Sequence, residues 1–94
     1  MKTATLQRGD LPDFGDEAAL YRLSEPYYDW RTTGKHYNFV VVYTNRNPLK
    51  RGTLVLPADE NGCISRERLN AETTVKSDEE ALASLGYQLV QPRP

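Results

Sequence analysis

The chain is poor in the side chains that build disulfides and metal centres. Its 94 residues include one cysteine, Cys63, and one histidine, His36. A lone cysteine cannot form an internal disulfide. One cysteine and one histidine cannot supply the four nitrogen or sulfur ligands of a structural zinc site. The sequence therefore predicts a protein that holds no metal ion and depends on no internal disulfide.

Catalytic and nucleotide-binding motifs are missing as well. Neither the G-x-x-x-x-G-K-[ST] loop nor the G-x-G-x-x-G loop occurs in the sequence. His36 is the one candidate general base, but the spacing identifies no serine or cysteine partner for it. A histidine at the edge of a loop is the simpler interpretation. We predict that the protein has no catalytic residues, binds no cofactor and is not an enzyme.

No long apolar run and no strong charge of either sign is present. No apolar run approaches the roughly 18 residues that are needed to span a bilayer. The first ten residues lack the apolar stretch of a signal peptide. The formal net charge is −1, which argues against bulk attraction to nucleic acid or to an anionic membrane. These features predict a cytoplasmic protein that does not associate with membranes.

Length and local patterns predict a single α+β domain. Ninety-four residues are enough for one hydrophobic core without disulfides or metals. Residues 1–18 are turn-rich and acidic, which predicts an N-terminal arm that is either mobile or attached by its few apolar side chains. The domain itself is then predicted over residues 19–91.

The domain is predicted to contain a three- to four-stranded antiparallel β-meander. Residues 19–24 alternate in polarity and predict a strand that ends at Pro26. Residues 37–44 are rich in β-branched and aromatic side chains and apolar on both faces, which predicts a central strand. Residues 52–57 predict its antiparallel partner. A short strand around residues 63–64 would follow, whereas the polar segment after it has no clear pattern.

One short helix is predicted over residues 77–85. Ser77 and Glu80 have the spacing of a capping box, and Gly86 is typical of the residue just after a helix. Nine residues do not form a stable helix alone, so this helix is predicted to pack on one face of the sheet. Residues 87–90 predict a last short strand or an extended tail.

The segment Pro26–Gly52 concentrates aromatic and basic side chains. It contains six of the nine aromatic residues and five of the twelve basic residues, against the single acid Asp29. Aromatic and arginine side chains often dominate the energy of protein interfaces. Because residues 37–44 are predicted as a core strand, two connections remain as candidate binding surfaces. The candidate partner-binding residues are Tyr27, Tyr28, Trp30 and Arg31 in the first connection, and Arg46, Lys50 and Arg51 in the second.

Both connections also have alternative interpretations. Trp30 and one tyrosine would cap the open end of the core, since tryptophan is highly buried on average. The basic residues of the second connection would be solvated charges that protect a sheet edge. Basic side chains beside exposed rings would instead bind nucleic acid, although no RNP or helix-turn-helix pattern occurs. An exposed sheet edge would allow a homodimer.

Four segments occur in a particular order along residues 20–87. They are Leu20–Leu23 before Pro26, Tyr37 with Val40–Val42, Leu56–Asp59 before Asn61-Gly62, and Glu79–Leu82 before Leu85–Tyr87. In this order they resemble a class of short uncharacterised proteins encoded by phages and prophages. The resemblance implies a small accessory protein that binds and blocks a host protein, in the manner of anti-CRISPR proteins. It assigns no catalytic residue.

These observations together predict a small non-catalytic protein-binding module of the inhibitor type. Its expected partner is a host or phage protein. Two alternatives stay open: a nucleic-acid-binding protein that uses the basic and aromatic residues 27–51, and a homo-oligomeric structural protein.

Overall fold

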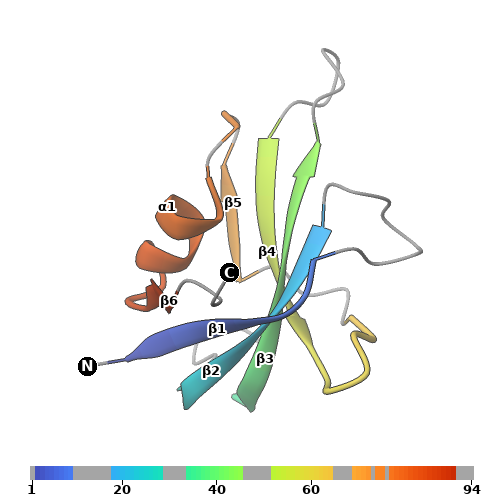
Figure 1. The fold of residues 1–94 in the computed structure, drawn as a ribbon, viewed down its shortest axis with the longest axis vertical. Helices are drawn as coiled ribbons and strands as arrows, with labels where there is room; N and C mark the ends of the chain where they lie inside the picture. The colour runs from blue at the N-terminus through green and yellow to red at the C-terminus, as the bar shows by residue number, and fades with distance from the viewer. Residues whose placement is uncertain are drawn as a thin grey trace.

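A computed structural model of the protein describes residues 2–9, 18–28, 34–45, 52–64, 69–72, 74–75 and 77–90. These residues form one twisted sheet of six strands, with a short helix against one face (Figure 1). The elements in chain order are β1 (Thr3–Arg8), β2 (Ala18–Tyr28), β3 (His36–Asn45), β4 (Gly52–Ala58), β5 (Asn70–Glu72), α1 (Asp78–Ala83) and β6 (Gln88–Val90).

The sheet is mixed, and its strand order is β5-β4-β3-β2-β1-β6. The first five strands are antiparallel neighbours in chain order. β6 returns to the outer side of β1 and pairs with it in parallel. The predicted α+β class and the helix on one face are therefore confirmed, as is the central position of β3. The prediction of a purely antiparallel meander with three to four strands is wrong, because β1, β5 and β6 extend the sheet.

The first strand lies in residues for which the sequence predicted an N-terminal arm. Ala4, which is fully buried, and Leu6 contact the main core, while Thr5 between them is exposed. This alternation covers too few residues for the sequence alone to predict a strand. Pairing with β2 on one side and β6 on the other stabilises β1.

The main core lies between the sheet and α1. Ala81 and Leu82 of the helix pack against Tyr21, Val40 and Val42 on the sheet. A second, smaller cluster on the opposite face contains Leu20 and Val41, and Phe39 and Tyr43 pack against it. Along β2 and β3 these residues alternate with residues of the main core, because successive side chains of a strand point to opposite faces. Both faces of β3 are therefore apolar at its centre, as the sequence predicts.

Local signals define both ends of α1. The Ser77 hydroxyl oxygen accepts a hydrogen bond from the Glu80 amide at 3.2 Å, which confirms the predicted N-cap. At the other end, the Gly86 amide donates to the Ala83 carbonyl and the Tyr87 amide donates to the Leu82 carbonyl. This pair of bonds is a Schellman motif, and Gly86 adopts the positive φ of 90° that the motif requires.

The hydroxyl groups of two buried tyrosines connect distant parts of the chain. Tyr21 on β2 donates to the carboxylate of Asp78, the first residue of α1. Tyr87 follows the Schellman motif, is 1% exposed, and donates to the Glu25 carbonyl oxygen at 2.8 Å. The first bond holds the start of the helix on the sheet, and the second holds the segment after the helix on β2.

Burial raises the pKa of both hydroxyl groups. For Tyr21, burial is the largest cause, and the hydrogen bond to Asp78 and its negative charge raise the pKa further above the usual 10.0. For Tyr87, burial again comes first, and the charges of Glu25 and Tyr27 add to it. The folded protein therefore holds both side chains in the neutral form at pH values where a free tyrosine ionises.

We predict that the free energy of unfolding decreases as the pH rises above about 10. Above pH 10 the unfolded chain releases the Tyr21 proton while the folded protein retains it. The contribution of Tyr21 to the free energy of unfolding is therefore complete below pH 10 and is lost as the pH rises towards the raised pKa of Tyr21 in the folded protein. Urea unfolding from pH 8 to 12 should show a flatter alkaline decrease for Tyr21→Phe. The exposed Tyr28 provides the matched control, since Tyr28→Phe should keep the wild-type slope. Parallel profiles for wild type and Tyr21→Phe would contradict this prediction.

The positive φ of Gly86 predicts that a side chain at this position strains the backbone, and this effect can be measured separately from any loss of packing. A Cβ atom added at Gly86 or at Gly9 would meet nothing within 4 Å, but only Gly86 has a positive φ. Gly86→Ala should lower the free energy of unfolding by about 1–2 kcal/mol. Gly9→Ala should change it by less than about 0.5 kcal/mol. Urea unfolding of the two variants tests this difference, and equal effects would show that the helix end does not depend on the conformation of Gly86.

Candidate protein-binding surface

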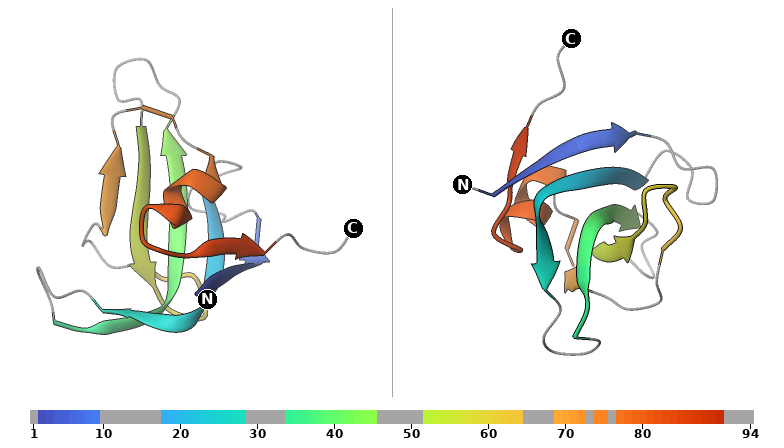
Figure 2. Two further views of the ribbon diagram at one scale, coloured as in Figure 1. Left: turned by 90° about the vertical axis from the view of Figure 1, so that its left-hand side faces the viewer. Right: turned by 90° about the horizontal axis from the view of Figure 1, so that it is seen from below.

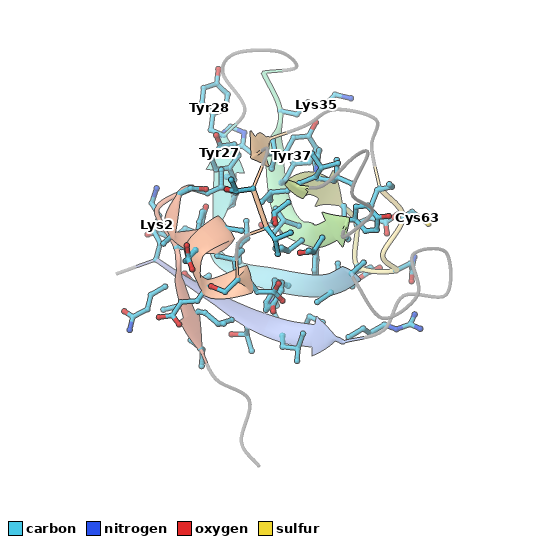
Figure 3. The ribbon with its side chains drawn as sticks, turned by 90° about the horizontal axis from the view of Figure 1, so that it is seen from above. Lys2, Tyr27, Tyr28, Lys35, Tyr37 and Cys63 are labelled. Carbon is cyan, nitrogen blue, oxygen red and sulfur yellow. The ribbon has the colours of Figure 1, made fainter. Side chains whose placement is uncertain are left out.

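The outer end of the β2–β3 hairpin carries four ring-bearing side chains in two cross-strand pairs. Tyr27 lies opposite Tyr37, and Tyr28 lies opposite His36, in the register of the two strands. Residues directly opposite each other in an antiparallel pair have neighbouring side chains. We call these four residues the hairpin end, and Figure 3 shows the ring of Tyr28 pointing outward there.

An irregular segment of β2 separates the hairpin end from the rest of the sheet. Arg22 pairs with Phe39 and Tyr27 pairs with Tyr37, so residues 23–26 of β2 lie opposite Asn38 alone. The extra residues bend the hairpin, and the outer ends of β2 and β3 project beyond the sheet (Figure 2). The sequence predicted that Pro26 ends the strand, which is wrong. Proline lacks an amide hydrogen and is tolerated at such an irregularity, so the strand resumes after it.

Contacts from both ends of the chain hold this irregular segment in place. The Tyr87 hydroxyl donates to the Glu25 carbonyl oxygen, and the Thr3 amide donates to the Ser24 hydroxyl oxygen at 2.8 Å. The Lys2 ammonium group lies 5.6 Å from the centroid of the Tyr87 ring, within the range of a cation–π contact. The hairpin end is therefore attached to β1 and to the chain segment that follows α1.

The two tyrosines of the first connection have different environments. Tyr27 is half-buried and packs against the main core. Tyr28 is 48% exposed, and its ring stacks on His36 with a centroid separation of 4.7 Å and an interplanar angle of 29°. The interpretation that rings of this connection cap the core thus applies to Tyr27, whereas Tyr28 presents an exposed aromatic surface.

The remaining candidate residues lie outside the described part of the chain. These residues are Trp30 and Arg31 between β2 and β3, and Arg46, Lys50 and Arg51 between β3 and β4. The flanking strand pairs are described: Tyr28–His36 closes one hairpin, and Asn45–Gly52 closes the other. These pairs are at opposite ends of β3, about 30 Å apart for a ten-residue strand. The two connections therefore begin at opposite ends of the sheet.

The structure separates the chemically reactive side chains. His36 is exposed and stacks on Tyr28, while Cys63 is exposed on another side of the molecule (Figure 3). Over the described ranges, no group of three histidine, cysteine, aspartate or glutamate residues could hold a metal ion. No helix in those ranges is long and apolar enough to cross a membrane.

Sequence patterns alone did not identify His36 as part of this surface. A single histidine beside a strand is most simply a loop-edge residue, and its partner Tyr28 is eight positions away across a connection. Its position beside Tyr28 depends on the register of β2 against β3, which the irregular segment shifts. The alternation of each strand could not predict that shift.

Comparisons of the chain with family models, with curated proteins and with solved structures find no match.

The different burial of the two tyrosines predicts different effects of the same substitution. Tyr27→Ala should lower the free energy of unfolding by about 2 kcal/mol, because the ring leaves a gap at the edge of the main core. Tyr28→Ala should lower it by less than about 1 kcal/mol, since only an exposed stacking contact is lost. Urea unfolding measures both values. If Tyr28→Ala were as destabilising as Tyr27→Ala, the ring of Tyr28 would belong to the core and not to a binding surface.

Proposed function

We propose that the protein is a small non-catalytic protein-binding module and that Tyr28, at the hairpin end, contacts the partner directly. The observation that carries this proposal is a large ring, 48% exposed, on a segment that is held from both ends of the chain. Trp30 and Arg31 follow Tyr28 closely in sequence, and we include them in the same surface.

Physical chemistry favours an exposed and stacked tyrosine as an interface anchor. Tyrosine supplies a large amphipathic contact area with few rotatable bonds. Its stacking on His36 and the attachment of the neighbouring segment to Tyr87 restrict its conformations before any partner arrives. Binding then loses less side-chain and loop entropy than it would at a free loop.

The partner that we propose is a host or phage protein, and the proposed effect is inhibition by occupying a surface of that protein. Support comes from the resemblance to phage- and prophage-encoded accessory proteins and from the lack of a catalytic motif in the sequence. A cytoplasmic location is part of this proposal. Arg46, Lys50 and Arg51 would form a separate contact, since their connection begins at the other end of β3.

Two features bear on the alternative functions. The outer strands β5 and β6 have three residues each, and short edge strands offer little surface for pairing with a second copy. For nucleic acid, the discriminating property is salt dependence, because phosphate contacts make affinity decrease steeply with salt concentration. A protein partner held by aromatic contacts should depend on salt much less.

We predict that Tyr28→Ala combined with Trp30→Ala abolishes partner binding with little change in the thermal midpoint. The single thiol of Cys63 allows attachment of biotin on a side away from Tyr28, so the immobilised protein can capture its partner from a lysate of the host cells. Captured proteins are then compared between wild type and the double variant by mass spectrometry.

Val90→Ala is the control, because it removes an exposed apolar side chain from β6, outside the hairpin end. It should capture the same partner as wild type. Retention of the partner by the folded double variant would contradict the proposal. Unfolding of the double variant would show that these rings belong to the core, and a partner released by moderate salt would favour nucleic acid.

A further inference from the structure

A shallow depression of about 290 Å³ lies between β1 and β2, on a part of the surface that the proposed function does not use. Its lining residues are Thr5, Gln7, Arg22, Leu23 and Ser24. Four of the five are exposed polar residues, and none of them is acidic. The depression is therefore open to solvent and carries one positive charge.

Strand register places the polar side chains together on the face of the sheet opposite α1. Thr5 and Arg22 are directly opposite each other in the antiparallel pair, so their side chains are neighbours. Tyr21 and Leu23, on either side of Arg22, belong to the core under the helix, so alternation directs Arg22 to the other face. The register between β1 and β2 shifts between Leu6 and Arg8, and Gln7 is the extra residue at that shift.

Three side chains that line the depression carry hydrogen-bond donors without an acceptor among the described residues. Arg22 forms no ion pair within the described residues, and its guanidinium group carries five N–H donors. The Ser24 oxygen accepts from the Thr3 amide, which leaves its hydroxyl hydrogen to donate outward. The Thr5 hydroxyl also has no partner in the described part of the chain. The Gln7 amide nitrogen is directed to the carbonyl oxygens of Thr5 and Leu6, at 3.4 and 3.5 Å.

We infer that this depression is a carboxylate-binding site in which Arg22 binds the carboxylate oxygens, with the hydroxyls of Thr5 and Ser24 as additional donors. Arginine binds carboxylates with two parallel hydrogen bonds, and charge-assisted bonds of this kind are stronger than neutral ones. The half-buried Phe39 lies opposite Arg22 on β3 and provides an apolar neighbour for the guanidinium group.

The charge of the site favours a carboxylate over the phosphates of a nucleic acid. A nucleic-acid backbone is normally bound by several cations along its path, whereas the lining of this depression contains only one. One positive charge matches the single negative charge of a carboxylate. The source would be an acidic side chain or the C-terminus of a polypeptide, and the site does not depend on the proposed role of the hairpin end.

Amide NMR titrations at constant ionic strength test this inference with three probes. The probes are a blocked tripeptide with one internal glutamate, an acetylated triglycine with a free C-terminal carboxylate, and inorganic phosphate. We expect saturable shifts at the amides of Thr5, Gln7, Arg22 and Ser24, with a dissociation constant on the order of millimolar for at least one peptide. The tighter of the two peptides identifies the source of the carboxylate.

Arg22→Gln should weaken peptide binding by about tenfold or more, because it removes the charge-assisted bonds. Thr5→Val, which keeps Arg22 and removes one hydroxyl, should weaken it less. Arg8→Gln is the matched control, since Arg8 is exposed on β1 and does not line the depression, and it should bind as wild type does. Tyr28→Ala should also leave this binding unchanged, which separates it from the proposed function. Shifts that do not saturate, equal affinity in Arg22→Gln, or tighter binding of phosphate than of either peptide would overturn the inference.

Discussion

Burial of Tyr87 is the constraint on which most of the arrangement depends. Its ring lies in the core between the sheet and α1, and its hydroxyl binds the Glu25 carbonyl oxygen in the irregular part of β2. The same residue ends the Schellman motif of the helix and leads directly into β6. This one side chain therefore connects the helix, the C-terminal strand and the bent hairpin. Through the pairing of β6 with β1, the connection extends to the first strand.

This connection explains how a small domain can present an exposed ring in a defined position. A two-stranded hairpin that projects beyond a sheet is only marginally stable without further support. Here Tyr27 packs on the main core, and Tyr87 and Thr3 hold the segment before it. Tyr28 is consequently exposed on a supported hairpin, and the polar depression around Arg22 includes Leu23 and Ser24 from the start of the same irregular segment on β2.

The sequence predicted the elements whose signals are local. The helix was predicted from Ser77 and Gly86, and both residues act as predicted, because caps depend on hydrogen bonds within a few residues. The strong strand β3 and its partner β4 were predicted for a similar reason, since a run of β-branched and aromatic residues favours extended backbone wherever it packs. For the candidate surface, the sequence pointed to Tyr27 and Tyr28 together, but it did not predict that Tyr27 is half-buried and Tyr28 exposed.

The sequence by itself determined the class of the domain, the ends of its helix and the central position of β3. Only the tertiary structure decided that β1, β5 and β6 join the sheet, because strands with few residues or weak patterns are stabilised by their neighbours. It also decided which tyrosine is buried and which is exposed. Residues 23–26 of β2 lie opposite Asn38 alone, and two of them are held by hydrogen bonds from Tyr87 and Thr3, which are distant in the sequence, so local patterns could not predict this irregular pairing.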